Sequence, residues 1–189
     1  MYRVLEHEMS SHHPTLTTTR LILRPWHDDD IAPFAAINQD AAVMRWIGDP
    51  LSVAQSEAWV GRMRTMWQEY GLGLFAAELR DTPGCIGYIG LSIPRFTAHF
   101  TPCVEIGWRL ASAVWGQGLA SEGATAVLAW AHTALQLSEV VSFTTRGNVA
   151  SQRVMQKIGM HYSPADDFDH PMLPADHPLR PHVLYRAQR

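Results

Sequence analysis

The chain has 189 residues, 47% of them hydrophobic, and a formal net charge of −3 from 15 basic and 18 acidic residues. This length and composition predict one compact domain with a sizeable core. The lack of excess positive charge argues against general nucleic-acid binding. Neither a signal peptide nor an 18-residue apolar run is visible, so we expect a cytoplasmic protein without membrane partners. Cys85 and Cys103 are too few for a disulfide framework and are interpreted as small buried hydrophobes.

The first half of the chain predicts one strand followed by two helices. Residues 1–14 are polar and predict a flexible arm, with a single domain expected over 15–189. Alternating apolar residues over 15–24 predict the first strand. Aspartates at 28–30 place negative charge ahead of a helical pattern, and the capping box at 52–55 predicts the start of a second helix.

The second half predicts more strands, with a helix on either side of the fifth. The pattern indicates an antiparallel hairpin (LFAAEL, CIGYIGLSI), a fourth strand (CVEIGWRL), a helix over 119–136, a strand over 139–145, a helix capped by Asn148 and a last strand HVLYRA. The order β-α-α-β-β-β-α-β-α-β predicts an α/β fold with a central mixed sheet and helices on both faces. Along the fourth strand, Glu105 and Arg109 lie on the face opposite Trp108.

A glycine-rich turn joins the fourth strand to the long helix. Gly116 and Gly118 allow backbone amides to approach a ligand closely, and the amides and dipole of a helix N-terminus favour a pyrophosphate. Short Gly-x-Gly turns are equally well explained as tight turns. A P-loop is excluded because no lysine follows Gly118. A dinucleotide fold is disfavoured because Glu139 begins the next strand, whereas that fold wants an acidic residue at its end.

Two motifs in this region carry a family resemblance. The run EIGWRLASAVWGQGLASEG, followed by NVASQRVMQKIGM, closely resembles the GNAT superfamily of N-acetyltransferases, most of all its RimJ/RimL-like branch, which includes ribosomal-protein N-terminal acetyltransferases. The similarity extends from about Leu16 to the last strand. The superfamily pattern Arg/Gln-x-x-Gly-x-Gly/Ala aligns its three fixed positions with Trp115, Gly118 and Ala120. Trp115 departs from the pattern, and the same substitution recurs in the RimJ/RimL-like branch.

The resemblance implies the GNAT fold, with a splay between the fourth and fifth strands, and acetyl-CoA as cosubstrate with no metal. It further implies direct transfer of an acetyl or other short acyl group to a primary amine. Coenzyme A contacts are expected at the exposed backbone of the fourth strand, at the glycine-rich turn and at the last helix: Trp108, Arg109, Leu110, Trp115, Gly116, Gln117, Gly118, Leu119, Ala120 and Asn148. Arg153 or Lys157 can meet the 3′-phosphate, although solvated surface charge is the commoner role.

Two side chains are candidates for the chemistry. Glu105 is the candidate general base, because it lies on the polar face of the fourth strand three residues before the Trp108 amide. The alternative is an ordinary carboxylate paired with Arg109. Ser151 is the candidate hydrogen-bond donor to the departing thiolate, since Met155 stands where many GNAT enzymes carry a tyrosine. A serine bonded back to a carbonyl is the alternative.

The acceptor site is expected to have aromatic walls. Its candidates are Trp46, Phe96, Phe100 and His170, each equally explained by packing. The irregular spacing of the histidines and aspartates between 161 and 182 argues against a metal site. The main alternative is a non-catalytic acyl-CoA-binding or sensing module, and a second is a partner-binding domain without cofactor. The acceptor remains open between a peptide N-terminus and a small-molecule amine, and a homodimer is compatible with the sequence.

Overall fold

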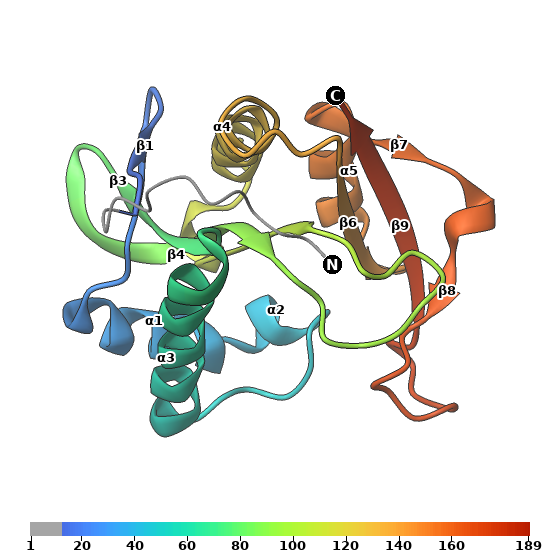
Figure 1. The fold of residues 1–189 in the computed structure, drawn as a ribbon. Coiled ribbons are helices and arrows are strands. Elements are labelled where there is room, and N and C mark those ends of the chain that lie inside the picture. Colours follow the sequence, from blue (N-terminus) through green and yellow to red (C-terminus); the bar gives the residue numbers. More distant parts are fainter. Residues whose placement is uncertain (1–12) are drawn as a thin grey trace.

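A computed structural model describes residues 13–189, so nearly all of the predicted arm lies outside the described residues (Figure 1). Short 3₁₀ turns at Asp28–Asp30, Ser112–Val114 and Pro164–Asp166 accompany the main elements. In chain order these are β1 (Leu16–Thr17), β2 (Leu21–Arg24), α1 (Ile31–Gln39), α2 (Ala41–Met44), α3 (Val53–Tyr70), β3 (Leu74–Leu79), β4 (Thr82–Ser92), β5 (Glu105–Leu110), α4 (Leu119–Thr133), β6 (Glu139–Thr145), α5 (Val149–Lys157), β7 (His161–Tyr162), β8 (Phe168–Asp169) and β9 (Pro181–Gln188).

Within the described residues the strands form one mixed sheet. The spatial order is β1-β2-β3-β4-β5-β6-β9-β7, with β8 paired to β9. β5 and β6 are parallel and the other neighbouring pairs are antiparallel. In Figure 1, α1, α2 and α3 lie below the sheet and α4 and α5 above it. The predicted mixed sheet with helices on both faces is confirmed.

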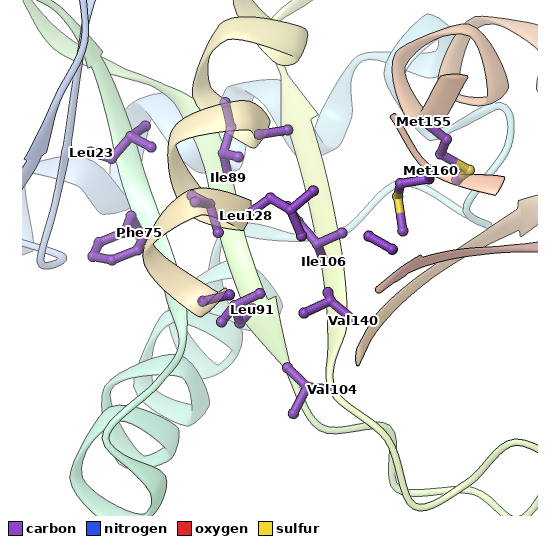
Figure 2. Close-up of a cluster of buried hydrophobic side chains, with 14 of the residues drawn as sticks. Leu23, Phe75, Ile89, Leu91, Val104, Ile106, Leu128, Val140, Met155 and Met160 are labelled. Atoms are coloured by element: carbon purple, nitrogen blue, oxygen red, sulfur yellow. The ribbon is translucent and has the colours of Figure 1, made fainter. Parts of the chain in front are cut away.

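Alternation along the strands divides the core between the two faces. On β3, Phe75 and Ala77 join the cluster that packs under α4, whereas Leu74 and Ala76 join the cluster against α1 and α3. Figure 2 shows the larger cluster, in which Leu128 of α4 lies over the strands. Full burial of each such leucine or phenylalanine stabilises the fold by roughly 1.5–3 kcal/mol. The prediction that both cysteines are buried is confirmed, because Cys85 and Cys103 are buried free thiols.

Most predicted helix ends are confirmed. Ser52 Oγ accepts from the Gln55 amide and Gln55 Oε1 accepts from the Ser52 amide, which is the predicted capping box. Gly71, with φ of 65°, ends α3 in the left-handed conformation. The long helix stops at Thr133, three residues before its predicted end. Gln136, at φ 54°, has already left helical geometry there.

The prediction of one continuous first strand is wrong, because this segment forms the antiparallel hairpin β1–β2. The break follows from Thr18, whose amide bonds to Leu21 O and whose hydroxyl donates to Glu122 Oε1 at 2.6 Å. The Arg20 amide also donates to that carboxylate. The long-range contact with α4 therefore turns the chain where the local alternation predicts a continuous strand.

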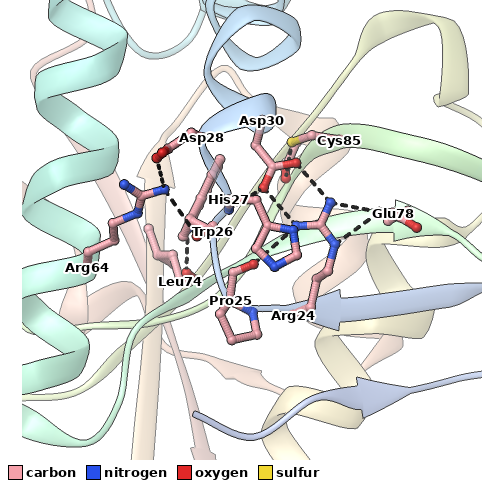
Figure 3. Close-up of polar contacts among 11 residues, drawn as sticks. Arg24, Pro25, Trp26, His27, Asp28, Asp30, Arg64, Leu74, Glu78 and Cys85 are labelled. Carbon is pink, nitrogen blue, oxygen red and sulfur yellow. Dashed lines mark hydrogen bonds and ion pairs between the residues drawn. The ribbon is translucent and has the colours of Figure 1, made fainter. Parts of the chain in front are cut away.

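A buried ion pair anchors the start of α1 (Figure 3). The guanidinium of Arg24 donates to both oxygens of Asp30, at 2.7 and 2.8 Å, and also to Glu78 at 2.7 Å. The His27 amide donates to Asp30 as well. Burial alone would raise the pKa of Asp30, but the bonds from Arg24 and His27 outweigh it and the pKa is lowered. This anchor fixes α1, which carries Asn38 to the candidate site.

Candidate active site

The parallel strands β5 and β6 meet at one end and then diverge. Glu105 pairs with Val141, the Val141 amide donates to Val104 O, and Ser142 Oγ donates to Ile106 O at 2.8 Å. No further β5–β6 pairing occurs among the described residues. A cleft of about 550 Å³ opens there, in the size range of roughly 300–1,000 Å³ typical of ligand sites. The predicted splay between the fourth and fifth strands is present.

The backbone of Trp108 points into this opening. Ala111 N donates to Ile86 O, which fixes the alternation of the β4–β5 ladder. By that alternation the N–H and C=O of Trp108 face away from β4, toward the splay. Leu110 O faces the same way and accepts from the Trp115 indole at 2.8 Å. Trp115, which departs from the family pattern, therefore ties the turn to the strand end.

The glycine-rich turn offers backbone amides to the cleft. Gly116 and Gly118 have φ of 75° and 79°, in the left-handed region that favours glycine. A Cβ at Gly116 would meet nothing within 4 Å, and one at Gly118 only Arg20 Nη2 at 3.7 Å. Helix α4 has no side-chain cap, unlike α3 and α5. Its first amides are therefore available, and they fit the pyrophosphate of a coenzyme.

Arg20 and Glu122 hold this turn in place, and sequence reasoning missed both. Arg20 Nε donates to Glu122 Oε2 at 2.7 Å, and Arg20 Nη1 donates to Gln117 O at 2.9 Å. Gln117, a predicted coenzyme contact, does not line the cleft. Arg20 lies within the stretch from Leu16 onward over which the family resemblance extends, and that extent was the available signal for it.

Glu105 lies at the start of the splay with its carboxyl group toward the cleft. Ser92 Oγ donates to its Oε2 at 3.0 Å, and Oε1 lies 3.9 Å from where a Cβ of Gly107 would be. Burial raises the pKa of Glu105 to about 7, against the lowering effect of the Ser92 hydrogen bond. Pairing with Arg109 is not observed, since that side chain bonds to Asn38. A carboxyl group that titrates near neutral pH suits a general base.

Asn148 and Ser151 meet the cleft from the start of α5. Asn148 Oδ1 accepts from the Ser151 amide at 3.3 Å, which confirms the predicted cap. Asn148 Nδ2 donates to Thr144 Oγ1 and to Ser151 Oγ, each at 3.0 Å. Ser151 Oγ therefore acts as an acceptor toward Asn148, and within residues 13–189 it makes no bond back to a carbonyl. Met155 is buried in the core.

Comparison with known proteins assigns the family. A model described as the acetyltransferase (GNAT) domain matches residues 20–161. The chain belongs to the GNAT acetyltransferases. It is 34% identical to the uncharacterized protein YkkB of Bacillus subtilis, over 78% of the chain and 86% of that protein. It is 31% identical to the uncharacterized N-acetyltransferase YoaA of the same organism, over 77% and 82%. Its fold matches Mycobacterium smegmatis RimJ in complex with CoA-disulfide, with TM-score 0.75 and 20% identity over 93% and 88%.

The predicted site residues divide into two groups in this acetyltransferase. Those that line the cleft are Glu105, Trp108, Arg109, Leu110, Trp115, Gly116, Gly118, Leu119, Ala120, Asn148, Ser151 and Trp46, with Arg153 and Lys157 exposed at its edge. Besides Gln117, the predicted residues that do not line it are Phe96, Phe100 and His170. The rings of these last three contact Phe143, which does line the cleft. Tyr88, Val43, Phe143 and His182 are lining residues that no sequence motif indicated.

Three further observations concern expectations drawn from the sequence. The part of the acetyltransferase that the structure describes holds no group of three or more His, Cys, Asp or Glu side chains arranged to bind a metal ion. Burial, together with the charge of His182, lowers the pKa of His170 to about 4, so this imidazole is neutral near pH 7. Among residues 13–189, no helix is both long enough and apolar enough to span a bilayer.

Proposed function

We propose that the acetyltransferase moves an acetyl group from acetyl-CoA directly to a primary amine, with Glu105 as general base and Ser151 as donor to the leaving thiolate. The observation that carries this proposal is the cleft itself. It contains the Glu105 carboxyl group on one diverging strand, the uncapped amides of α4 and the Ser151 hydroxyl of α5. These are the base, the phosphate seat and the thiolate donor that the reaction requires.

Each residue then has one task. The Trp108 amide, directed into the splay, donates to the thioester oxygen and polarises the carbonyl group. Glu105 removes a proton from the amine as the nitrogen attacks. The new C–N bond forms while the C–S bond breaks, and Ser151 donates a hydrogen bond to the departing sulfur. The proton held by Glu105 passes to solvent before the next turnover.

The α4 turn and the edge of the cleft bind the coenzyme. The amides of Gly118 and Leu119 donate to no side-chain cap among the described residues, so they can donate to the pyrophosphate oxygens. Arg153 and Lys157 are exposed at the cleft edge, where they can meet the 3′-phosphate. A non-catalytic acyl-CoA-binding module would have no use for a carboxyl group with a pKa of about 7 in the same cleft, and this favours the enzyme.

The deciding test is release of free thiol from acetyl-CoA over a panel of small amines and peptide N-termini. We expect acetyl-CoA to raise the melting temperature and one acceptor class to accelerate thiol release, with an acetylated product of matching mass. Thermal stabilisation without transfer to any acceptor would support the sensing module instead. No stabilisation would support a partner-binding domain without cofactor. Both acceptor classes, peptide α-amines and small molecules, fit this proposal.

A further inference from the structure

Arg109 is a buried arginine that forms no ion pair with any described residue. The residue as a whole is only 8% exposed. Nη1 donates to Asn38 Oδ1 at 2.5 Å, and Nε is buried with no acceptor in the described part of the chain. A guanidinium remains charged and presents several N–H donors, so a buried one without a counter-charge carries a large desolvation cost. This arrangement points to an anion that is bound during function.

Neutral groups hold Arg109 in its position. Asn38 Nδ2 donates to Ser56 Oγ at 3.0 Å, and Ser56 Oγ donates to Ser52 O at 3.0 Å. Asn38 and Ser56 are fully buried. Helices α1 and α3 therefore fix the guanidinium from behind through a chain of neutral hydrogen bonds. Its direction is set in advance, but no carboxylate of the described residues pairs with its charge.

The charge of Arg109 faces the acceptor side of the cleft. Tyr88 belongs to β4, on the far side of β5 from the splay, so only its side chain can line the cleft. The guanidinium carbon of Arg109 lies 5.5 Å from the centre of that ring. Arg109 also shares its strand face with Glu105, four residues earlier, and Gly107 between them adds no side chain. The cleft thus has a fixed positive charge beyond its candidate base.

We propose that Arg109 binds a carboxylate of the acceptor, so that the substrates are amines carrying a carboxylate several bonds from the reacting nitrogen. This inference rests on the proposed function, with Glu105 as the base. Asn38 occupies Nη1, which leaves Nε and Nη2, the side fork of the guanidinium, for the two oxygens of a carboxylate. Four strand residues span about 13 Å between Cα atoms. Strand side chains stand roughly perpendicular to the sheet, so a comparable separation of the two charged groups favours an ω-amino acid or a short acidic peptide over an α-amino acid.

The test compares kcat/KM for ε-aminocaproate and for its neutral amide, with acetyl-CoA as donor. We expect the folded wild-type enzyme to prefer the carboxylate by about 10- to 100-fold, the range for a charge-assisted hydrogen bond. In Arg109→Met the ratio should fall to about 1. Arg109→Lys keeps a charge without the fork and should retain only part of the preference. For glycine and β-alanine, which are shorter, the ratio of kcat/KM between the acid and its neutral amide should be smaller than for ε-aminocaproate.

Arg62→Gln is the matched control, because Arg62 is exposed on α3 and does not line the cleft, and it should leave the ratio unchanged. Equal wild-type rates for the carboxylate and the amide would overturn the proposal, as would a preference that survives Arg109→Met. A preference for succinyl-CoA over acetyl-CoA that disappears in Arg109→Met, without any preference among amines, would place the anion on the acyl group and also overturn it. Failure of acetyl-CoA binding itself is a different result, because it removes the proposed function.

Discussion

The indole of Trp46 lies directly against the backbone of Gly147. A Cβ at residue 147 would come within 2.7 Å of Trp46 Cζ3 and 3.0 Å of Cη2. Trp46 follows α2, whereas Gly147 precedes the Asn148 cap of α5, so this contact bridges the cleft from one wall to the other. A side chain at 147 would therefore displace the indole from that side of the cleft.

Gly147→Ala should displace the indole of Trp46 and widen the cleft. We expect kcat/KM for the acceptor to fall roughly 10- to 100-fold, since small misplacements in a site have effects of this size, while the KM for acetyl-CoA changes little. Steady-state kinetics with each substrate varied would check this. Gly61→Ala is the control, because a Cβ there meets nothing within 4 Å in the interior of α3. Unchanged acceptor kinetics in Gly147→Ala would show that the contact has no role in binding.

Glu105→Gln should lower kcat by roughly 10²- to 10⁴-fold, the usual effect of losing a positioned base, with acetyl-CoA affinity nearly intact. Because the pKa of Glu105 is about 7, the wild-type rate should rise with pH through that value as the carboxylate forms. This rise of the rate with pH should disappear in Glu105→Gln. A pH–rate profile on both proteins, with calorimetry for acetyl-CoA, tests this, and near-normal turnover in the variant would place the base elsewhere.

Glu105 should also make the fold less stable as pH rises. Its folded pKa of about 7 exceeds the ordinary value of 4.5, so between these values the folded state binds more protons than the unfolded state. Stability from this group is therefore lost as pH rises from about 4.5 to 7. Urea unfolding at pH 5 and pH 8 measures the free energy of unfolding of both proteins. Relative to the wild type, Glu105→Gln should be more stable at pH 8 than at pH 5, by at most roughly 3 kcal/mol. An equal difference at both values would show that the carboxyl group is solvated.

The parts of the fold predicted from sequence are those that local patterns determine. The Ser52 capping box, the αL end at Gly71 and the alternation along β5 each depend on residues a few positions apart. The division of the first strand depends on Glu122, which is 102 residues from Arg20 in the chain. No window of local periodicity contains such a contact.

The candidate site shows the same division. Asn148 and Ser151 lie within one helical turn, so their capping geometry was predictable. The environment of Arg109 depends on Asn38, 71 residues away, and sequence alternation left pairing with Glu105 open. For the aromatic acceptor wall, composition indicated rings but could not determine which of them line the cleft and which pack behind it.

Gly118→Trp should abolish acetyl-CoA binding. The φ of 79° is strained for any side chain, and an indole there would occupy the space in front of the uncapped α4 amides. Calorimetry should find about one acetyl-CoA per chain in the wild type and none in the folded variant. Gly159→Ala provides the comparison, since its φ of 83° carries similar strain away from the cleft. If Gly118→Trp binds normally, the turn is not the phosphate seat.

Ser151→Ala should reduce turnover by about 10- to 100-fold with little change in acetyl-CoA binding. The hydroxyl accepts from Asn148 Nδ2, so its own proton is directed elsewhere, and a hydrogen bond to a charged sulfur contributes roughly 1.5–3 kcal/mol. Serine is too weak an acid to protonate the thiolate fully, which limits the loss.

Two comparisons separate this role from the packing of α5. Met155→Ala removes a buried side chain that is 1% exposed, lines the cleft and has no hydrogen-bond donor, so it should mainly lower the melting temperature and should not change the dependence on the leaving thiol. Ser151→Thr keeps the hydroxyl and should retain more turnover than Ser151→Ala.

Acetyl transfer to the same amine from two thioesters, one with a good and one with a poor leaving thiol, adds a further measurement. The loss in Ser151→Ala should be larger for the poorer leaving group, because more negative charge then develops on sulfur. Equal losses for both thiols would mean that Ser151 acts through the Asn148 cap and not on the sulfur.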